Sequence, residues 1–314
     1  MELSVIIINW NSQVYLRECL HSLDRGTPGL AREVLVIDNA SYDGCREMLV
    51  AEFPQVKFIQ SDRNLGFSGG NNRAASHAKG DFLLFLNPDI IIEMNSLAKL
   101  VMALRDLPAA GIVGARLLNT DRTLQTSCVQ SFPTVVNQVL NCELLRRRFP
   151  RSSLWGMSAL FDASHDPMPV EAVSGACLMI KRKVFELVGG FDERYFMYSE
   201  DIDISYKVGQ AGFKCYYVPT AIVIHHGGGS SKQAPSAFSN VMLRESVYRF
   251  FRLHRGRSVA NCFRFFIGLS ALLRLPVAAV IWLRHRHVDA KAPFIKWISI
   301  FRWSLGLESW AAKQ

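Results

Sequence analysis

Residues 3–11 read LSVIIINWN, an apolar run rich in β-branched side chains that ends in polar residues. Such runs are typical of strands that are buried on both faces of a parallel sheet. Three further runs of this kind follow at residues 33–37, 56–59 and 81–86, and segments with helical character separate them. Strands that alternate with helices at this spacing predict βαβ units and an α/β fold with a twisted, mostly parallel sheet.

Polar motifs follow each of these four strands. They are Asn9-Trp10-Asn11, Asp38–Gly44, Asn64–Asn72 and Asn87-Pro88-Asp89. Each motif alone is typical of an ordinary turn. Ligands of parallel α/β sheets, however, bind beyond the carboxyl ends of the strands. Four polar motifs at one edge of a sheet therefore predict a ligand-binding cleft.

The second and third motifs indicate a nucleotide. A carboxylate at the end of the second strand, here Asp38, is the usual acidic partner of a nucleoside in doubly wound folds. Gly66, Gly69 and Gly70 let the backbone approach a ligand closely, and the helix that begins there offers free N–H groups to phosphate. The chain has neither a GxGxxG fingerprint nor a Gly-Lys-Ser or Gly-Lys-Thr sequence at this point. These absences count against a nicotinamide cofactor and against ATP.

Two acidic motifs suggest chemistry at the same cleft. Asp89 follows a rigid Asn-Pro turn, and one carboxylate plus diphosphate oxygens is a common way to hold Mg²⁺ or Mn²⁺. Glu200, Asp201 and Asp203 crowd three carboxylates into four residues at the start of a segment with helical spacing. Like-charge repulsion makes this cluster costly unless a metal, a cationic substrate or a helix N-terminus compensates it. The alternatives are an ordinary Asn-Pro turn and an exposed acidic helix start.

Together these motifs resemble glycosyltransferase family 2, and within it the chain is most similar to the bacterial rhamnosyltransferases that build surface polysaccharide. The resemblance spans about residues 3–231 and keeps the motifs in the family's order. It implies a GT-A fold, a nucleotide-sugar donor, a divalent ion (Mg²⁺ or Mn²⁺) and inversion at the anomeric carbon. The first guess for the donor is dTDP-rhamnose, with a UDP-sugar as the alternative. A lipid-linked or oligosaccharide acceptor is expected.

The resemblance also assigns roles to single residues. The catalytic pair is Asp201, as general base, and Glu200. The nucleotide-sugar site comprises Asn9, Asn11, Asp38, Asn64, Gly66, Phe67, Gly70, Asn71 and Asn87. The metal site comprises Asp89 and His225, with His226 as a competing ligand, and the acceptor site comprises Tyr198 and Asp203.

Two of these assignments carry further expectations. Asn87 replaces the first aspartate of the family's Asp-x-Asp motif, so Asp89 is left as the main carboxylate for the ion. The neighbouring acids Glu200 and Asp203 are expected to raise the proton affinity of Asp201 towards the working pH.

Composition is that of a folded protein in a reducing compartment. Of the 314 residues, 49% are hydrophobic and 20% are charged, which excludes a disordered chain. The seven cysteines are dispersed and form no CxxC pair, as expected of reduced thiols rather than a disulfide frame or a zinc site. The N-terminus begins a strand at once and lacks the pattern of a signal peptide. A cytoplasmic location is therefore expected.

The C-terminal region is basic and aromatic. Between Arg244 and Arg302 there are twelve Lys or Arg residues against two acids, so this region carries a charge of +10 and the rest of the chain −1. Within it, residues 263–283 are mostly apolar and long enough to cross a bilayer. Arg264, Arg274 and Pro276 argue against a simple span, because a central arginine is costly in hydrocarbon. The pattern suits helices, bent as a pair at Pro276, that lie on the inner face of the plasma membrane against anionic lipid.

Two alternatives remain for this basic region: a helical subdomain that packs on the sheet, and a dimer interface. Long aliphatic stretches separate its basic residues, so nucleic acid is not expected as a partner, and nucleic-acid binding stays a less favoured function. A nucleotidyltransferase is disfavoured because no Gly-rich, Lys/Arg-bearing phosphate loop follows the first strand.

The predicted domains are a GT-A catalytic domain at 1–235 and a C-terminal helical, membrane-associating region at 236–314. The catalytic domain is expected to divide into a nucleotide-binding half, about 1–110, and an acceptor or catalytic half, 111–235. Residues 141–170 are irregular and are expected to form either a mobile segment over the cleft or a solvated insertion.

Overall fold

The computed structural model describes residues 1–27, 29–227, 236–285 and 291–313, and they form two compact units. The first unit comprises Met1–Phe132, Pro150–Phe196 and Glu200–Ser230, and the second comprises Pro133–Phe149, Met197–Ser199 and Ser231–Gln314. The second unit thus contains Pro133–Phe149 and Met197–Ser199 in addition to the C-terminal region. The predicted C-terminal region, 236–314, did not include these two segments. Residues 228–231 of the glycine-rich motif after His226, and Arg286 and His287 of the basic region, lie outside the described residues.

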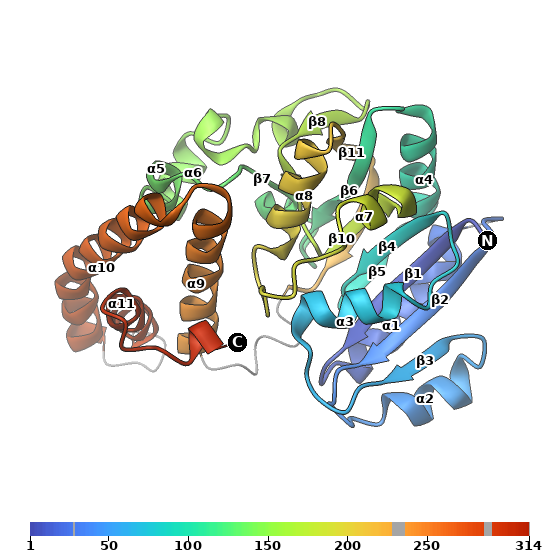
Figure 1. Ribbon diagram of the computed structural model, residues 1–314, viewed down its shortest axis with the longest axis horizontal. Coiled ribbons are helices and arrows are strands. Elements are labelled where there is room, and N and C mark those ends of the chain that lie inside the picture. The colour runs from blue at the N-terminus through green and yellow to red at the C-terminus, as the bar shows by residue number, and fades with distance from the viewer. Residues whose placement is uncertain (28, 228–235, 286–290, 314) are drawn as a thin grey trace. The chain divides into compact units, whose positions relative to one another are not determined.

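The first unit is built on a mixed sheet (Figure 1). Its strands, within the described residues, are β1 (Leu3–Asn9), β2 (Arg32–Asp38), β3 (Lys57–Gln60), β4 (Phe82–Leu86), β5 (Ile90–Ile92), β6 (Ala110–Leu118), β8 (Met168–Val170), β10 (Cys177–Lys181) and β11 (Lys214–His225). The order is β3-β2-β1-β4-β10-β6-β11-β5, and β8 pairs with β11. The strands β1 to β4 are mutually parallel, β6 and β11 are parallel, and β10 runs antiparallel between β4 and β6. A separate two-stranded ribbon joins β7 (Val129–Gln130) to β9 (Ala172–Val173).

Helices cover both faces of this sheet. They are α1 (Gln13–Gly26), α2 (Cys45–Glu52), α3 (Gly66–Ala75), α4 (Ser96–Asp106), α7 (Arg182–Leu187) and α8 (Glu200–Gln210), with 3₁₀ turns at Thr126–Cys128, Ser153–Trp155 and Ser158–Phe161. Side chains of α3, α7 and α8 form one buried cluster with β1, β2, β4, β6 and β10, and these three helices lie in front of the sheet in Figure 1. The helices α1 and α4 contact β5, β6, β10 and β11 but add no side chain to that cluster, so they cover the opposite face.

The second unit is helical. It contains α5 (Val135–Val139), α6 (Glu143–Arg148), α9 (Ser236–His254), α10 (Arg257–His285), α11 (Ala292–Ser304) and a 3₁₀ turn at Ala311–Lys313. The helix α10 contacts α5, α9 and α11. The indole of Trp303, 1% exposed, donates to the Glu245 carboxylate at 2.8 Å in the buried centre of these helices. A helical C-terminal region is therefore confirmed.

Most of the predicted elements are confirmed. The four predicted strands are β1 to β4, and the acidic cluster opens helix α8 as expected. The sequence predicted a pair of helices that meet at Pro276, whereas in the structure α10 is one helix of 29 residues with Pro276 inside it. The irregular segment 141–170 contains α6 and the two 3₁₀ turns before β8.

Candidate active site

The predicted site residues gather at one edge of the sheet. Because β1, β2 and β4 are parallel, their carboxyl ends meet there. The antiparallel strand β10 begins at that edge, with Cys177 opposite Leu86 at the end of β4. The strand β6 is antiparallel to β10 and parallel to β11, so the carboxyl end of β11, at His225, reaches the same edge.

A network of hydrogen bonds shapes the loop after β2. The Asp38 carboxylate, 1% exposed, accepts hydrogen bonds from Asn9 Nδ2 at 2.9 Å, from Gln60 Nε2 at 2.9 Å, and from the hydroxyl and backbone of Ser41 and the backbone of Tyr42. Burial raises the pKa of Asp38, but the hydrogen bonds from Ser41, Gln60 and Asn9 outweigh it and hold the pKa below its ordinary value. Asp38 therefore stays ionised and orders the loop, and its direct contact with a nucleoside remains a prediction.

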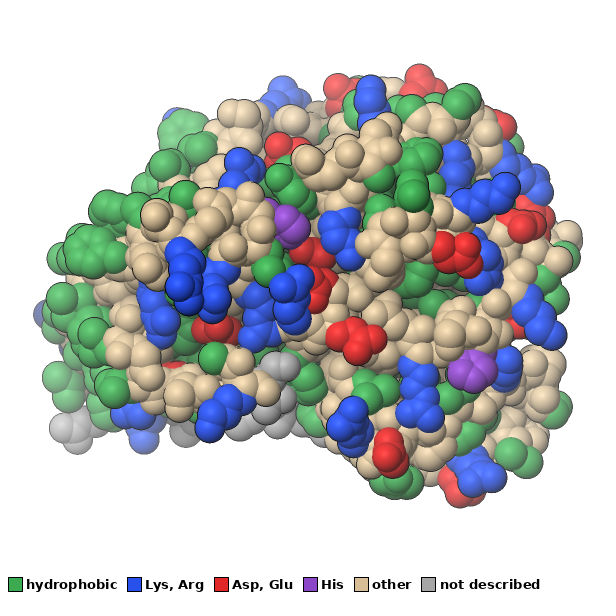
Figure 2. Space-filling model, viewed as in Figure 1, with side chains coloured by type: hydrophobic (Ala, Val, Ile, Leu, Met, Phe, Trp, Pro, Cys, Tyr) green, Lys and Arg blue, Asp and Glu red, His purple; other side chains and the backbone are tan. Residues whose placement is uncertain are grey.

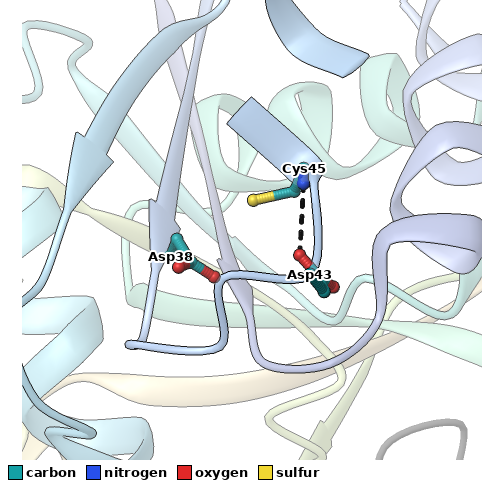
Figure 3. A group of neighbouring side chains, drawn as sticks. All are labelled: Asp38, Asp43 and Cys45. Atoms are coloured by element: carbon teal, nitrogen blue, oxygen red, sulfur yellow. Dashed lines mark hydrogen bonds between the residues drawn. The ribbon is translucent and has the colours of Figure 1, made fainter. Parts of the chain in front are cut away.

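Three side chains beside this loop, Asp38, Asp43 and Cys45, lie close enough to hold a cation (Figure 3). Their oxygens are already hydrogen-bonded, however. Asp43 Oδ1 accepts from Asn9 Nδ2 at 3.0 Å and from the backbone N–H of Cys45 at 3.2 Å, and Oδ2 accepts from the backbone N–H of Gln13 at 2.9 Å. Donors aimed at both carboxylates serve the purpose that a cation would serve. The cluster therefore closes the loop onto α1 and α2.

Asn9 was predicted to bind the nucleotide, but the structure gives it a role inside the protein. Its side chain is fully buried, and its Nδ2 group lies within 3.0 Å of Asp38 Oδ1, Ser41 Oγ and Asp43 Oδ1. A buried amide that is used this way positions the loop rather than touching a ligand. Asn11, by contrast, is exposed, with a positive φ of 51° at the end of β1, where a ligand can reach it.

A second network fixes the loop that opens α3. Asn39 donates to Asn64 Oδ1 at 2.9 Å and to the Gly66 carbonyl at 3.0 Å, and it accepts from the Leu65 backbone at 3.0 Å. Gly66 has a φ of +69°, and a Cβ added there would lie 2.3 Å from the Phe196 carbonyl oxygen. Only glycine therefore fits this position, because the backbone is both left-handed and crowded.

The other predicted residues of α3 are largely internal. A Cβ at Gly70 would meet Ile8 of β1 at 3.0 Å, so this glycine serves close packing of helix on strand rather than ligand approach. Asn71 is 2% exposed, and its Nδ2 has no hydrogen-bond partner among the described residues. The Phe67 ring lies 3.4 Å from the position of a Cβ on Gly175, next to Asp201. The Phe67 ring therefore lies beside the start of α8.

Asp89 and His225 form the predicted ion site. Asp89 lies between β4 and β5, is 6% exposed, and its Oδ1 is 3.3 Å from His225 Nε2 at the end of β11. Asn87 Nδ2 lies 3.5 Å from the same nitrogen. Adjacent ligands of one ion at bond lengths of about 2.0–2.2 Å are roughly 3 Å apart. The carboxylate and the imidazole therefore fit a divalent ion as a pair of ligands.

The two neighbouring histidines point in different directions. The His226 ring lies 5.3 Å from the Tyr15 ring on α1, and its Nε2 is 3.8 Å from Glu18. Only its backbone N–H reaches Asp89, donating to the carbonyl at 3.0 Å. Successive side chains at the end of a strand alternate in direction. His225, not His226, therefore faces the carboxylate.

Asp201 is held at the N-terminus of α8 by three donors. Its Oδ2 accepts from Gln130 Nε2 and from the Gly175 backbone, each at 3.0 Å, and its Oδ1 accepts from the Ile202 backbone at 2.8 Å. Gly175 precedes Ala176, whose carbonyl accepts from the Asn87 backbone at 2.9 Å. This short chain of contacts connects the Asp201 carboxylate to the Asn87-Pro88-Asp89 turn.

The pKa of Asp201 is raised, as expected, but the cause of the rise differs from the predicted one. Burial raises the pKa of Asp201, and the hydrogen bonds from Gly175, Ile202 and Gln130 offset part of that rise. The predicted effect of Glu200 and Asp203 is not among its causes. Burial also raises the pKa of Glu200, well above its ordinary value, and the charges of Asp201 and Asp203 add to that rise. Glu200 is therefore the acid of this pair that carries a proton most firmly.

Glu200→Gln is expected to stabilise the protein at neutral pH. The folded state binds the Glu200 proton more tightly than the unfolded state, so wild-type stability is lost as the pH rises above the ordinary glutamic acid range, about 4.3. Glutamine resembles the protonated acid and removes this loss. Urea unfolding should show the variant gaining on the wild type between pH 4 and pH 8. A difference in unfolding free energy that does not vary with pH would show that Glu200 is ionised in the folded state.

The two residues that were predicted to bind the acceptor, Asp203 and Tyr198, lie in different units of the structure. The Asp203 side chain is 0% exposed and lies 3.8 Å from Lys207 Nζ, one turn along α8. The prediction that Asp203 binds the acceptor therefore does not fit the structure, because this residue is buried and its nearest charged partner is Lys207. Tyr198 belongs to the second unit, and its role stays a prediction. Its φ of 71° and the φ of 64° at Ser199 place two left-handed residues directly before α8.

Two surface hollows lie away from these residues. One, of about 470 Å³, is lined by the α3 residues Gly69, Asn72 and Arg73 together with Glu193. The other, of about 480 Å³, lies between Phe132 and the start of β11 at Lys214. Neither is lined by Asp89, Asp201 or His225. The chemistry of the sheet edge, rather than these hollows, identifies the site.

Four residues that contact the predicted site were not named individually from the sequence. Two of them, Asn39 and Asp43, belong to the Asp38–Gly44 motif, which the sequence did indicate. Gln125 and Gln130 lie in the segment between β6 and β9, in which nothing in the sequence pattern marks a glutamine as functional. Gln125 contacts His225, and Gln130 contacts Asp201.

Known proteins resemble the chain in both sequence and structure. The Glycosyl transferase family 2 profile matches residues 4–188, and the Glycosyl transferase family group 2 profile matches residues 123–307. N-acetylglucosaminyl-diphospho-decaprenol L-rhamnosyltransferase of Mycobacterium tuberculosis is 30% identical over 248 residues, which cover 75% of this chain and 79% of the relative. Rhamnosyltransferase WbbL of Escherichia coli is 24% identical over 266 residues, which cover 82% of this chain and 94% of the relative.

Solved structures share the GT-A fold. Mannosyltransferase PcManGT of Pyrobaculum calidifontis, in complex with GDP-Man and Mn²⁺, aligns with a TM-score of 0.59 at 15% identity, covering 98% of this chain and 86% of that one. S. aureus TarS in complex with UDP-GlcNAc aligns with a TM-score of 0.53 at 16% identity, covering 98% and 92%. The chain therefore belongs to glycosyltransferase family 2, and its relatives place it among the nucleotide-sugar glycosyltransferases of polysaccharide biosynthesis.

Proposed function

We propose that the protein transfers rhamnose from dTDP-rhamnose, with inversion, to a hydroxyl of a lipid-linked saccharide. The observation that carries this proposal is the arrangement at the sheet edge. A partly exposed Asp201 is held by three donors and connects, through the Gly175–Asn87 contacts, to the Asp89–His225 pair. A base and a diphosphate-binding ion site on one edge are what a single displacement at an anomeric carbon requires.

Asp201 is the proposed general base. The acceptor oxygen attacks the anomeric carbon while the nucleoside diphosphate leaves from the opposite face, and the hydroxyl proton passes to the carboxylate. Oδ2 already accepts two hydrogen bonds and Oδ1 accepts one, so Oδ1 is the oxygen with a lone pair left for the proton. The raised pKa of Asp201 makes it a stronger base than an ordinary aspartate. Activity is therefore expected to fall as the pH drops through that raised pKa.

Asp89 and His225 are the proposed ligands of Mg²⁺ or Mn²⁺. When bound, such an ion stabilises the negative charge that develops on the leaving diphosphate. His225 Nε2 and Asp89 Oδ1 lie 3.3 Å apart, which is the spacing of two adjacent ligands of one ion. PcManGT, which shares the fold, was solved with GDP-Man and Mn²⁺, and this supports the proposal.

The donor is tested by a panel of nucleotide sugars in the presence of Mn²⁺. The relatives from M. tuberculosis and E. coli are rhamnosyltransferases, so dTDP-rhamnose is expected to raise the melting temperature most. A ligand at 100 times its Kd stabilises the folded state by about 2.7 kcal/mol. NMR of the product should then show an anomeric configuration opposite to that of the donor. Retention of configuration, or stabilisation by a different nucleotide sugar alone, would contradict the proposal.

A UDP-sugar is the second candidate for the donor. TarS, which shares the fold, was solved with UDP-GlcNAc, and uridine and deoxythymidine present the same hydrogen-bonding edge to a protein. The same panel compares dTDP-rhamnose directly with UDP-sugars. If the protein binds both uridine and thymidine diphosphates, its contacts with the sugar decide which donor is used.

We place the acceptor at a membrane surface because of the helix α10. The segment Arg257–Arg284 is long and apolar enough to cross a membrane, and its most apolar 18 residues have a mean hydropathy of 2.0. One broad stretch of its surface is apolar and exposed, formed by Phe265, Phe266, Leu269, Leu272, Leu273, Val277, Val280, Ile281 and Leu283. Hydrophobic side chains also gather over the region of α10 in Figure 2.

Arg264 and Arg274, the two arginines inside the apolar part of α10, contact partners within the second unit. Arg264 donates to the Trp303 carbonyl at 2.7 Å and lies 5.1 Å from the Trp303 ring, and Arg274 lies 4.7 Å from the Trp297 ring. The helix therefore has one face bound to α11 and another that is exposed and apolar. This arrangement favours a helix that lies in the interface of an anionic leaflet over one that spans it.

Membrane binding is expected to depend on this exposed face. The triple variant Phe265→Glu, Leu273→Glu, Leu283→Glu places charges where the side chains are 66–69% exposed, so the fold should survive. Wild-type protein should float with vesicles that contain phosphatidylglycerol, and the variant should stay in solution. Leu187→Glu is the matched control, because Leu187 is 66% exposed in the first unit. Equal recovery of the wild type in solution with and without vesicles would overturn this assignment.

A further inference from the structure

The side-chain amide of Gln125 makes two contacts with His225. Its Nε2 donates to the His225 carbonyl oxygen at 2.8 Å, and its Oε1 lies 2.9 Å from His225 Nδ1. These two contacts use the donor end and the acceptor end of one amide. The side chain of Gln125 thus contacts the backbone and the ring of the same residue.

The contacts determine which ring nitrogen carries the proton. A carbonyl oxygen can only accept a hydrogen bond, so the Gln125 NH₂ group has to face it and Oε1 has to face the ring. Because Oε1 can only accept, Nδ1 has to carry a hydrogen and donate it. The ring nitrogen left to bind an ion is then Nε2, which lies 3.3 Å from Asp89 Oδ1.

We propose that Gln125 is a positioning residue that fixes His225 as the Nδ1–H tautomer and aims the Nε2 lone pair at the ion beside Asp89. This inference rests on the proposed ion site and adds to it a residue outside the known motifs. Partners that bind the second nitrogen of a ligating histidine set both its orientation and its basicity. Gln125 is the only side chain that the hydrogen bonds of the described residues show on Nδ1 of His225.

The backbone of Gln125 is itself anchored, so the amide is held in place. Its N–H donates to the Leu117 carbonyl of β6 at 2.9 Å, and its carbonyl accepts from the Cys128 N–H at 3.2 Å. The strand β6 pairs with β11 beside it, with Leu118 opposite Ile224. The residue that orients His225 is therefore fixed to the neighbouring strand of the same sheet.

The test measures binding of Mn²⁺ alone by calorimetry at pH 7.5, with full-length protein. Gln125→Leu removes both contacts at similar size, and the Kd for Mn²⁺ is expected to rise about 10- to 100-fold. Gln125→Glu keeps an acceptor for Nδ1–H and should restore most of the affinity. Gln55→Leu is the matched control, because Gln55 is exposed in the first unit and contacts neither His225 nor Asp201, and it should leave the affinity unchanged.

A second measurement needs no variant of Gln125. In ¹⁵N-histidine-labelled wild type without metal, the His225 signals, assigned with His225→Gln, should show a hydrogen on Nδ1. The opposite tautomer would overturn the inference, and so would an unchanged Mn²⁺ affinity in a folded Gln125→Leu protein. A wild type that binds no Mn²⁺ would instead overturn the proposed ion site, and the inference with it.

Discussion

Asp201→Asn is expected to lower kcat by roughly 10²-fold or more, with donor binding little changed. Asparagine keeps the size of the side chain and can still accept from Gln130 and Gly175 through its oxygen. It cannot take the proton of the acceptor hydroxyl. The measurement is single-turnover transfer at saturating donor and acceptor, together with the Kd of the donor diphosphate.

The control for this variant is Glu200→Gln. Glu200 is 7% exposed and its pKa is raised well above the ordinary value, so its amide variant resembles the protonated acid that the folded protein already contains. A smaller loss of kcat is expected there than in Asp201→Asn. Turnover close to that of the wild type in Asp201→Asn would remove Asp201 from the role of base.

Asp89→Asn is expected to lower kcat/KM by roughly 10²-fold or more and to abolish the response to added Mn²⁺. Asp89 is the one carboxylate of the Asn87-Pro88-Asp89 turn and therefore the anionic ligand that this turn offers to an ion. Its loss leaves His225 Nε2 facing an amide instead of an anion. Activity should be titrated against Mn²⁺ and Mg²⁺, and Mn²⁺ binding should be measured separately.

Asp43→Asn is the matched control for the ion site. Asp43 belongs to the other carboxylate group, in which its oxygens accept from Asn9, Gln13 and Cys45. This variant should weaken the loop after β2 and leave the Mn²⁺ affinity intact. Loss of Mn²⁺ binding in Asp43→Asn, with normal binding in Asp89→Asn, would move the ion to the cluster of Figure 3.

The first half of the fold was predictable because its signals are local. Runs such as Leu3–Ile8 are long, apolar and β-branched, and each ends in polar residues, so both the strands and the edge that carries the site follow from the pattern. The three-residue strand Ile90–Ile92 was missed because it directly follows the Asp89 turn and is too short to show a period. The antiparallel insertion of β10 between β4 and β6 depends on pairing across a long stretch of chain, which no local pattern reveals.

The site was predictable only where a motif carried it. Asp89, Asp201 and His225 belong to motifs and reach one sheet edge. The choice between His225 and His226 required the direction of each side chain. The burial of Asp203 is a property of the folded chain that the acidic motif does not reveal. Gln125 and Gln130 carry no signal at all, because a lone glutamine acquires its role only when the chain brings it to a partner 100 or 71 residues away.

The most direct test of the central claim is a crystal structure with dTDP and Mn²⁺ bound. We predict that the ion is coordinated by Asp89 and by Nε2 of His225 and contacts the diphosphate, with the Asp201 carboxylate open to the same cleft. An ion held at Asp38 and Asp43, or a diphosphate bound away from Asp89 with Asp201 on another surface, would contradict it.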